Sequence, residues 1–157
     1  MIPTTEVKFV EVIQPASIAQ NTETDVEIDT LGYDFCNVYI LCGAMGAALD
    51  ICKLADGDTS GGTFTDIAAA TLGDSACVNL AGTAVALSAT DDNDVICFQV
   101  DMSARGRYLK LLTSTANSSG ASVFGAVAIL GRSRAVRTDV EGDHVVTAAG
   151  DIDVIRV

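Results

Sequence analysis

The stretch Thr24–Ala44, TDVEIDTLGYDFCNVYILCGA, decides the fold class of this 157-residue chain. In its first part Val26 and Ile28 alternate with acidic residues, a period of two that is typical of a strand with one buried face. Gly32 interrupts this pattern. After it, residues 38–42 are apolar at every position, which predicts a strand that is covered on both faces. Together the two patterns favour an all-β fold in which one sheet packs on another.

Strand-like segments recur at intervals of roughly ten residues along the rest of the chain. Pro15 is expected to end the first of them, because proline cannot donate to a sheet ladder. The Ala-rich run Ile67–Leu72 also fits a helical turn, and Val123–Leu130 is expected to be covered on both faces. About eight to ten short antiparallel strands predict a β-sandwich with jelly-roll or Greek-key wiring. Beyond the opening stretch, we expect strands at Val7–Ile13, Leu49–Leu54, Phe64–Ala70, Ala76–Leu80, Thr83–Ser88, Val95–Met102, Arg107–Thr113 and Val123–Leu130.

The composition changes at Gly131, after which the chain is charged and rich in turn residues. We therefore divide it into a β-sandwich domain, residues 1–131, and a C-terminal extension, residues 132–157. The extension contains two short β-prone pieces, His144–Thr147 and Ile152–Val157. It either folds back as a hairpin or forms an arm that adds a strand to a neighbouring subunit. Because an unpaired apolar strand is an aggregation hazard, candidate contacts in the extension are Ile152, Val154 and Ile155.

The formal net charge of −12 argues against a nucleic acid or an anionic membrane as partner, because both would repel the chain. The charge is also uneven. Residues 1–104 contain only two basic side chains, whereas residues 105–157 contain seven bases against five acids. This asymmetry either serves solubility alone or marks a region that docks on an acidic partner. In the second case the candidate contacts are Arg105, Arg107, Arg132, Arg134 and Arg137.

Residues for catalysis or metal binding are scarce. His144 is the only histidine, and the run Gly131–Ala135 lacks the closing glycine of a nucleophile elbow. The five cysteines lie in apolar strand-like runs without CxxC spacing, so we expect buried, reduced thiols and no zinc site. We predict no enzymatic activity and no cofactor. The N-terminal residues do not resemble a signal peptide, and we expect synthesis in a reducing cytoplasm.

Two acidic loops leave open whether a cation binds. The loop Asp56–Gly61 copies the first half of a calcium loop, but Ile67 stands where the closing glutamate is required. The turn Asp91–Asp94 places three carboxylates within four residues. The alternative for both segments is an ordinary solvated turn.

Three parts of the chain carry a family resemblance: TDVEIDTLGYDFCNVYILCGAM, the passage Asp56–Ile67, and SARGRYLKLL followed by a small-residue strand that ends in GRSR. Over about residues 16–134 the chain resembles the decoration, or cement, proteins of tailed bacteriophages. The resemblance rests on the order of these patterns, because the family has no fixed motif for its contacts. The extension from Ala135 has no counterpart.

The resemblance implies a structural virion protein that binds the outer surface of the major capsid protein lattice as a homo-oligomer, commonly a trimer. Its location would be the outside of the capsid, after synthesis in the cytoplasm of the bacterial host. The alternative is a carbohydrate- or receptor-binding β-sandwich of a virion fibre or cell surface, which would expose aromatic rings for stacking on sugars. A hydrolase using scattered carboxylates is a third class, but the chain has no Trp to build an aromatic cleft.

Overall fold

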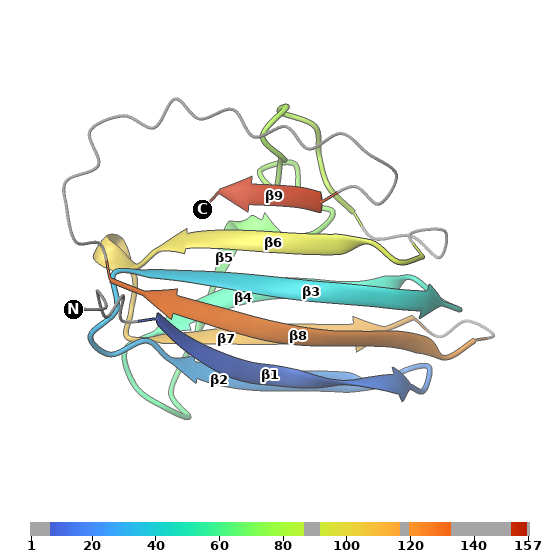
Figure 1. Cartoon of the computed structure of the whole chain (residues 1–157), viewed down its shortest axis with the longest axis horizontal. Coiled ribbons are helices and arrows are strands. Elements are labelled where there is room, and N and C mark those ends of the chain that lie inside the picture. Colours follow the sequence, from blue (N-terminus) through green and yellow to red (C-terminus); the bar gives the residue numbers. More distant parts are fainter. Residues whose placement is uncertain (1–6, 87–91, 117–119, 133–151, 157) are drawn as a thin grey trace, which may run out of the picture.

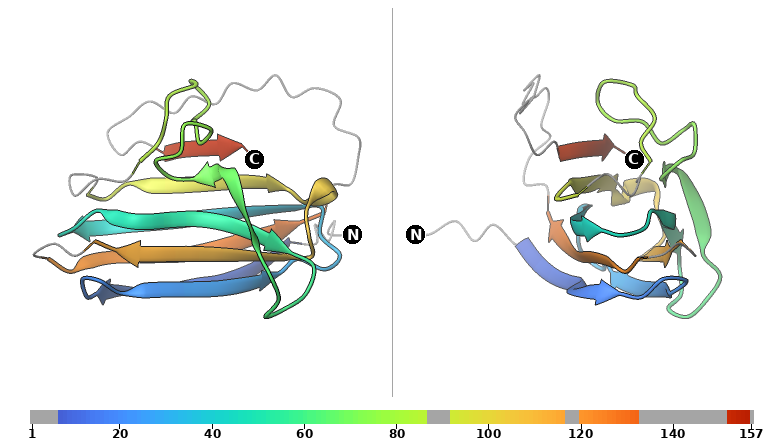
Figure 2. Two further views of the ribbon diagram at one scale, coloured as in Figure 1. Left: turned by 180° about the vertical axis from the view of Figure 1, so that it is seen from behind. Right: turned by 90° about the vertical axis from the view of Figure 1, so that its right-hand side faces the viewer.

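Two β-sheets lie face to face, which confirms the predicted β-sandwich (Figures 1 and 2). The computed structural model describes residues 7–86, 92–116, 120–132 and 152–156. One sheet has five strands, in the order β1 (Val7–Ile18), β8 (Ser122–Gly131), β3 (Phe35–Met45), β6 (Val95–Asp101) and β9 (Ile152–Arg156). The other has four, in the order β2 (Glu23–Asp29), β7 (Tyr108–Thr115), β4 (Leu49–Gly57) and β5 (Thr65–Thr71).

The antiparallel pairs are nested: β1 pairs with β8, β2 with β7, β3 with β6, and β4 with β5. This is the order produced when one long antiparallel ribbon is rolled into two sheets, and we interpret it as jelly-roll wiring. The ninth strand stands outside the pattern. β9 pairs with β6 in parallel, at the edge of the five-stranded sheet. The hairpin partner expected at residues 144–147 lies outside the described residues.

The hydrophobic core lies between the sheets and consists of alternate residues from the facing strands. On β6, Ile96, Phe98 and Val100 all point inward and are buried, as their spacing predicts. Small side chains on β8 keep the layers close, because the core positions next to Phe124 are alanines. The largest fully buried side chains are Phe98, Phe124, Ile28, Ile40, Leu54, Ile96, Leu109, Leu111, Leu130, Val38 and Val100.

The first strand does not end at Pro15, contrary to expectation, but continues to Ile18. Its register with β8 shifts between Ile13 and Ala16, so Pro15 lies in an irregular step of an edge strand. A missing N–H is tolerated there because the ladder is already interrupted. Gly125 on β8 makes room for the ring: a Cβ at this position would lie 2.9 Å from three atoms of Pro15.

The expectation that β3 and β8 are covered on both faces is wrong for the single chain. Leu41 on β3 is 45% exposed and Val123 on β8 is 37% exposed, while Tyr39 and Val127 are half-buried. These residues point away from the core, on the outer side of the five-stranded sheet, which is the sheet nearest the viewer in Figure 1. None of the described residues covers them fully.

Between β4 and β6 one expectation is confirmed and another is wrong. The strand expected at Phe64–Ala70 is present as β5 (Thr65–Thr71), which excludes the alternative of a helical turn there. The two strands expected at residues 76–80 and 83–88 are a loop, in which a single bridge joins Val78 to Ala84 and residues 87 and 88 lie outside the described residues. Gly82 has a φ of +78° at the tip of this loop, a conformation that glycine adopts without strain.

Candidate assembly surfaces

Arg107 is engaged within its own chain. Its Nε and Nη2 donate to the two carboxylate oxygens of Asp29 at 2.9 and 2.7 Å, and its guanidinium lies 4.8 Å from the centre of the Tyr108 ring. The hydrogen bonds from Arg107 lower the pKa of Asp29 from 3.8 to about 2. The expected contact with an acidic partner therefore competes with a bidentate pair that already exists.

Arg132 follows β8 and reaches back to the turn between β2 and β3. Its Nε donates to the carbonyl oxygen of Gly32, and its guanidinium lies 5.8 Å from the centre of the Tyr33 ring. Gly32 has a φ of +81°, and a Cβ there would lie 3.0 Å from Nη2 of Arg132. The turn thus needs glycine both for its backbone and for the space that the arginine occupies.

Arg105 lines a polar cleft of about 420 Å³ at the same end of the sandwich. Across the cleft, Oδ2 of Asp56 accepts a hydrogen bond from the backbone N–H of Gly106 at 2.9 Å. The two loops touch, because a Cβ on Gly106 would lie 2.5 Å from the carbonyl carbon of Gly57. The lining residues are Asp56, Gly57, Asp58, Thr63, Thr65, Ala104, Arg105 and Gly106.

Among the described residues, the candidate arginines at this end are interleaved with carboxylates and do not form a separate basic patch. Asp29, Asp56 and Asp58 lie among them. Arg134 and Arg137 lie outside the described residues. The candidate residues of the extension are in β9, where Ile152 lies opposite Val95, Val154 opposite Cys97 and Ile155 opposite Phe98 in the backbone register.

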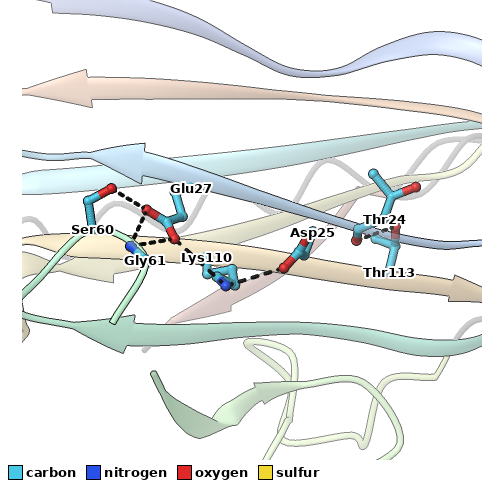
Figure 3. Close-up of polar contacts among 7 residues, drawn as sticks. All are labelled: Thr24, Asp25, Glu27, Ser60, Gly61, Lys110 and Thr113. Atoms are coloured by element: carbon cyan, nitrogen blue, oxygen red, sulfur yellow. Dashed lines mark hydrogen bonds and ion pairs between the residues drawn. The ribbon is translucent and has the colours of Figure 1, made fainter. Parts of the chain in front are cut away.

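The two acidic loops are held by contacts within the protein. Ser60 and the backbone N–H of Gly61 donate to the carboxylate of Glu27, as Figure 3 shows. Oδ1 of Asp92 accepts a hydrogen bond from the N–H of Met45 at 2.6 Å. In the part of the chain that the structure describes, no group of three or more His, Cys, Asp or Glu side chains is placed to hold a metal ion. Asp91 lies outside that part.

The outer surface of the four-stranded sheet carries ion pairs between neighbouring strands. Nζ of Lys110 lies 3.2 Å from Asp25 and 3.7 Å from Glu27 (Figure 3). Nζ of Lys53 lies 2.6 Å from Asp66 on the neighbouring strand. Such exposed pairs each contribute only about 0–1 kcal/mol to stability, so they mark a face suited to water. We call this surface the charged face; it consists of Asp25, Glu27, Asp29, Lys53, Asp66 and Lys110.

The outer surface of the five-stranded sheet has the opposite chemistry. Phe9 is 70% exposed on β1, and the ring of Phe35 lies across Gly131, where a Cβ would be 2.2 Å from that ring. Val7 is exposed as well. We call this surface the apolar face; it consists of Val7, Phe9, Phe35, Tyr39, Leu41, Val95, Val123, Val127 and Ile129.

Sequence reasoning missed the apolar face, although its signal was present. The apolar residues at every position from 38 to 42 on β3 predicted two-sided coverage, and that coverage was assigned to the chain itself. The expectation about the cysteines was better: all five are buried. Burial raises the pKa of Cys36 to about 12 and that of Cys97 to about 11, which keeps both thiols protonated at neutral pH.

The described residues contain no helix with the length and apolar character needed to cross a membrane. Comparisons of the chain with protein-family models, with curated proteins and with solved structures gave no match.

Proposed function

We propose that this protein is a structural component of a phage virion, which decorates and stabilises the capsid by binding the outer surface of the major capsid protein lattice as a homo-oligomer. The observation that carries the proposal is the division of the sandwich into an apolar face and a charged face. An apolar face suits a protein that docks on other proteins, and a charged face suits a protein that stays exposed on a particle surface.

The mechanism relies on repetition. Each subunit contributes modest contacts, and an oligomer that meets several capsid subunits at once binds far more tightly than one contact allows. The net charge of −12 is compatible with an exterior position, because packaged DNA would repel the chain. No catalytic step is required of any residue.

The capsid contacts in this proposal are the arginines at the cleft end together with the extension. Arg105 and Arg132, with Arg134 and Arg137, meet acidic capsid surface. Arg107 contributes less, because binding elsewhere would cost it the pair with Asp29. The apolar residues of the extension, Ile152, Val154 and Ile155, contact the capsid or a neighbouring subunit.

The test is co-sedimentation with purified, undecorated heads. The wild-type protein should pellet with the heads and raise their resistance to heat. A variant that combines Arg105→Glu, Arg132→Glu, Arg134→Glu and Arg137→Glu should remain in the supernatant. Lys53→Glu is the control, because it reverses a charge on the charged face, and it should bind as the wild type does.

The proposed contacts are wrong if the arginine variant binds heads normally while its circular dichroism matches that of the wild type. The decoration proposal itself fails if the wild-type protein binds no expanded head of any phage that grows in the bacterium in which this protein is made.

A second candidate function is carbohydrate binding, which the polar cleft favours. Asp56, Asp58 and Arg105 present the hydrogen-bonding groups that sugar hydroxyls require. The described lining residues include no aromatic ring on which a sugar would stack. A glycan array separates the two functions. Saturable binding of one sugar that Asp58→Asn abolishes supports carbohydrate binding. No binding to any sugar on the array, together with binding to phage heads, supports decoration.

A further inference from the structure

The starting point is a mismatch between the apolar pattern of the five-stranded sheet and the burial that the described residues provide. A sheet with one face on the core and one in water alternates apolar with polar residues. β2 follows this rule, with Val26 and Ile28 inward and acids outward. β3 does not, because Tyr39 and Leu41 point outward on either side of the buried Ile40.

Residues of the apolar face pair in register across the strands: Phe9 with Ile129 between β1 and β8, Val127 with Tyr39 between β8 and β3, and Leu41 with Val95 between β3 and β6. The polar Asn37 and Gln99 lie in the row next to Tyr39 and are the polar interruption of this face on β3 and β6. Gly131 on β8 leaves room for the ring of Phe35 on the neighbouring strand β3. Figure 1 looks onto the outer side of the five-stranded sheet, which carries this face, and the back view in Figure 2 looks onto the outer side of the four-stranded sheet.

The size of the face is adequate for a specific contact. Strands about 4.8 Å apart and about seven residues long, at ~3.4 Å per residue, give four strands a projected area of roughly 450 Å². The relief of the side chains increases this area. Two partners together then bury about 1,000 Å² or more, which is the lower bound of a specific protein interface.

We propose that the apolar face is a subunit contact, covered by a second copy of this chain. The inference rests on the proposed function for the existence of a homo-oligomer and names the surface that forms it. Sheets with the same twist stack at about 10 Å, which gives a second copy a natural fit on this face.

Charge identifies the face on which two copies of the chain can meet. Each chain carries a net charge of −12, so two copies repel each other, most strongly where carboxylates gather as on the charged face. The apolar face carries its charged neighbours, Glu11 and Asp101, only at its margin, on the edge strand and at the end of β6. It is therefore the described sheet face on which copies can approach with the least repulsion.

An apolar contact between two acidic chains predicts a specific salt dependence of their association. Salt screens the repulsion between the two acidic chains and leaves apolar contact intact, so association should strengthen as ionic strength rises. An interface built from ion pairs would weaken under the same conditions.

A matched pair of variants tests the proposal. Val123→Asp places a carboxylate on the apolar face, and Ile51→Asp places one on the outer surface of the other sheet; both positions are 37% exposed. Native mass spectrometry and sedimentation of the purified full chain should give a multiple of 16.2 kDa for the wild type and for Ile51→Asp. Val123→Asp should dissociate at a concentration about tenfold higher or more. Circular dichroism confirms the fold of each variant, and Leu41→Asp repeats the test if Val123→Asp fails to fold.

The outcomes separate this proposal from the decoration function. A monomeric wild type, or an oligomer that survives both Val123→Asp and Leu41→Asp, overturns the subunit contact. If monomers still bind heads, decoration stands and the apolar face docks on the capsid instead. If an oligomer forms through this face and binds no head, the subunit contact stands and decoration fails.

Discussion

Two adjacent leucines on β7 provide a direct test of how the sandwich is packed. Leu111 points into the core, opposite Val26 and Leu54, and is fully buried. Leu112 points outward between Asp25 and Lys53 and is half-buried. The same substitution to alanine at the two positions should therefore have very different effects on stability.

The magnitudes follow from the packing. Leu→Ala removes three carbon atoms, about 2.4 kcal/mol in transfer free energy at ~0.8 kcal/mol per group. At Leu111 a closed cavity adds to this, giving about 3–4 kcal/mol in total. At Leu112 water fills the space, and a loss of about 1 kcal/mol is expected. For a chain of this length the larger loss corresponds to a decrease in Tm of roughly 6–16 °C.

Urea denaturation followed by far-ultraviolet circular dichroism measures both variants, with the slope m as a check that the unfolded state is unchanged. The chain has no Trp, so circular dichroism is preferred to fluorescence. Equal losses at the two positions, or a larger loss at Leu112, would refute the inward and outward assignment of β7.

Three further predictions follow. Arg107 lowers the pKa of Asp29 from 3.8 to about 2, so the stability from this pair is present above pH 3.8 and is lost as pH falls toward 2. In Arg107→Gln the loss of stability over this pH range should be smaller, which acid denaturation curves measure. A curve identical to that of the wild type would contradict the pairing. The five buried thiols should not react with a thiol reagent in the native state and should react rapidly in urea; fast native labelling of any of them would show that its burial is wrong. Gly106→Ala should cost about 1–3 kcal/mol because its Cβ would clash with the backbone of Gly57. A Gly→Ala change at an uncrowded site with negative φ instead stabilises by about 0.4–1 kcal/mol. Wild-type stability of Gly106→Ala in urea denaturation would show that the backbones of Gly106 and Gly57 are not in contact.

Local patterns predicted the class of the fold well. The alternation in residues 24–29 gave β2, and the strand expected at Val95–Met102 is β6, Val95–Asp101. Both succeed because the side-chain period of a strand is a local property. The end of β1 was missed because tolerance of Pro15 depends on a bulge and on Gly125, more than a hundred residues away.

The candidate surfaces were harder to predict for the same reason. From the sequence, Arg107 was expected to be available to a partner protein. It pairs instead with Asp29, which is 78 residues away in the sequence, and no pattern near either residue predicts that pair. The strand order, and with it the meeting of the cleft loops, also depends on long-range pairing. The apolar residues of β3 were recognised as needing cover on two sides, but a sequence does not reveal whether that cover comes from within the chain.

The nested strand pairing has a consequence for how this polypeptide matures. Because β1 pairs with β8, more than a hundred residues must be synthesised after β1 before its partner strand exists. Chains with such distant strand partners fold slowly and meanwhile expose unpaired strand edges that aggregate. The five-stranded sheet can therefore close only after β8 has been made, and prematurely terminated chains that lack β8 should accumulate as inclusion bodies or be degraded.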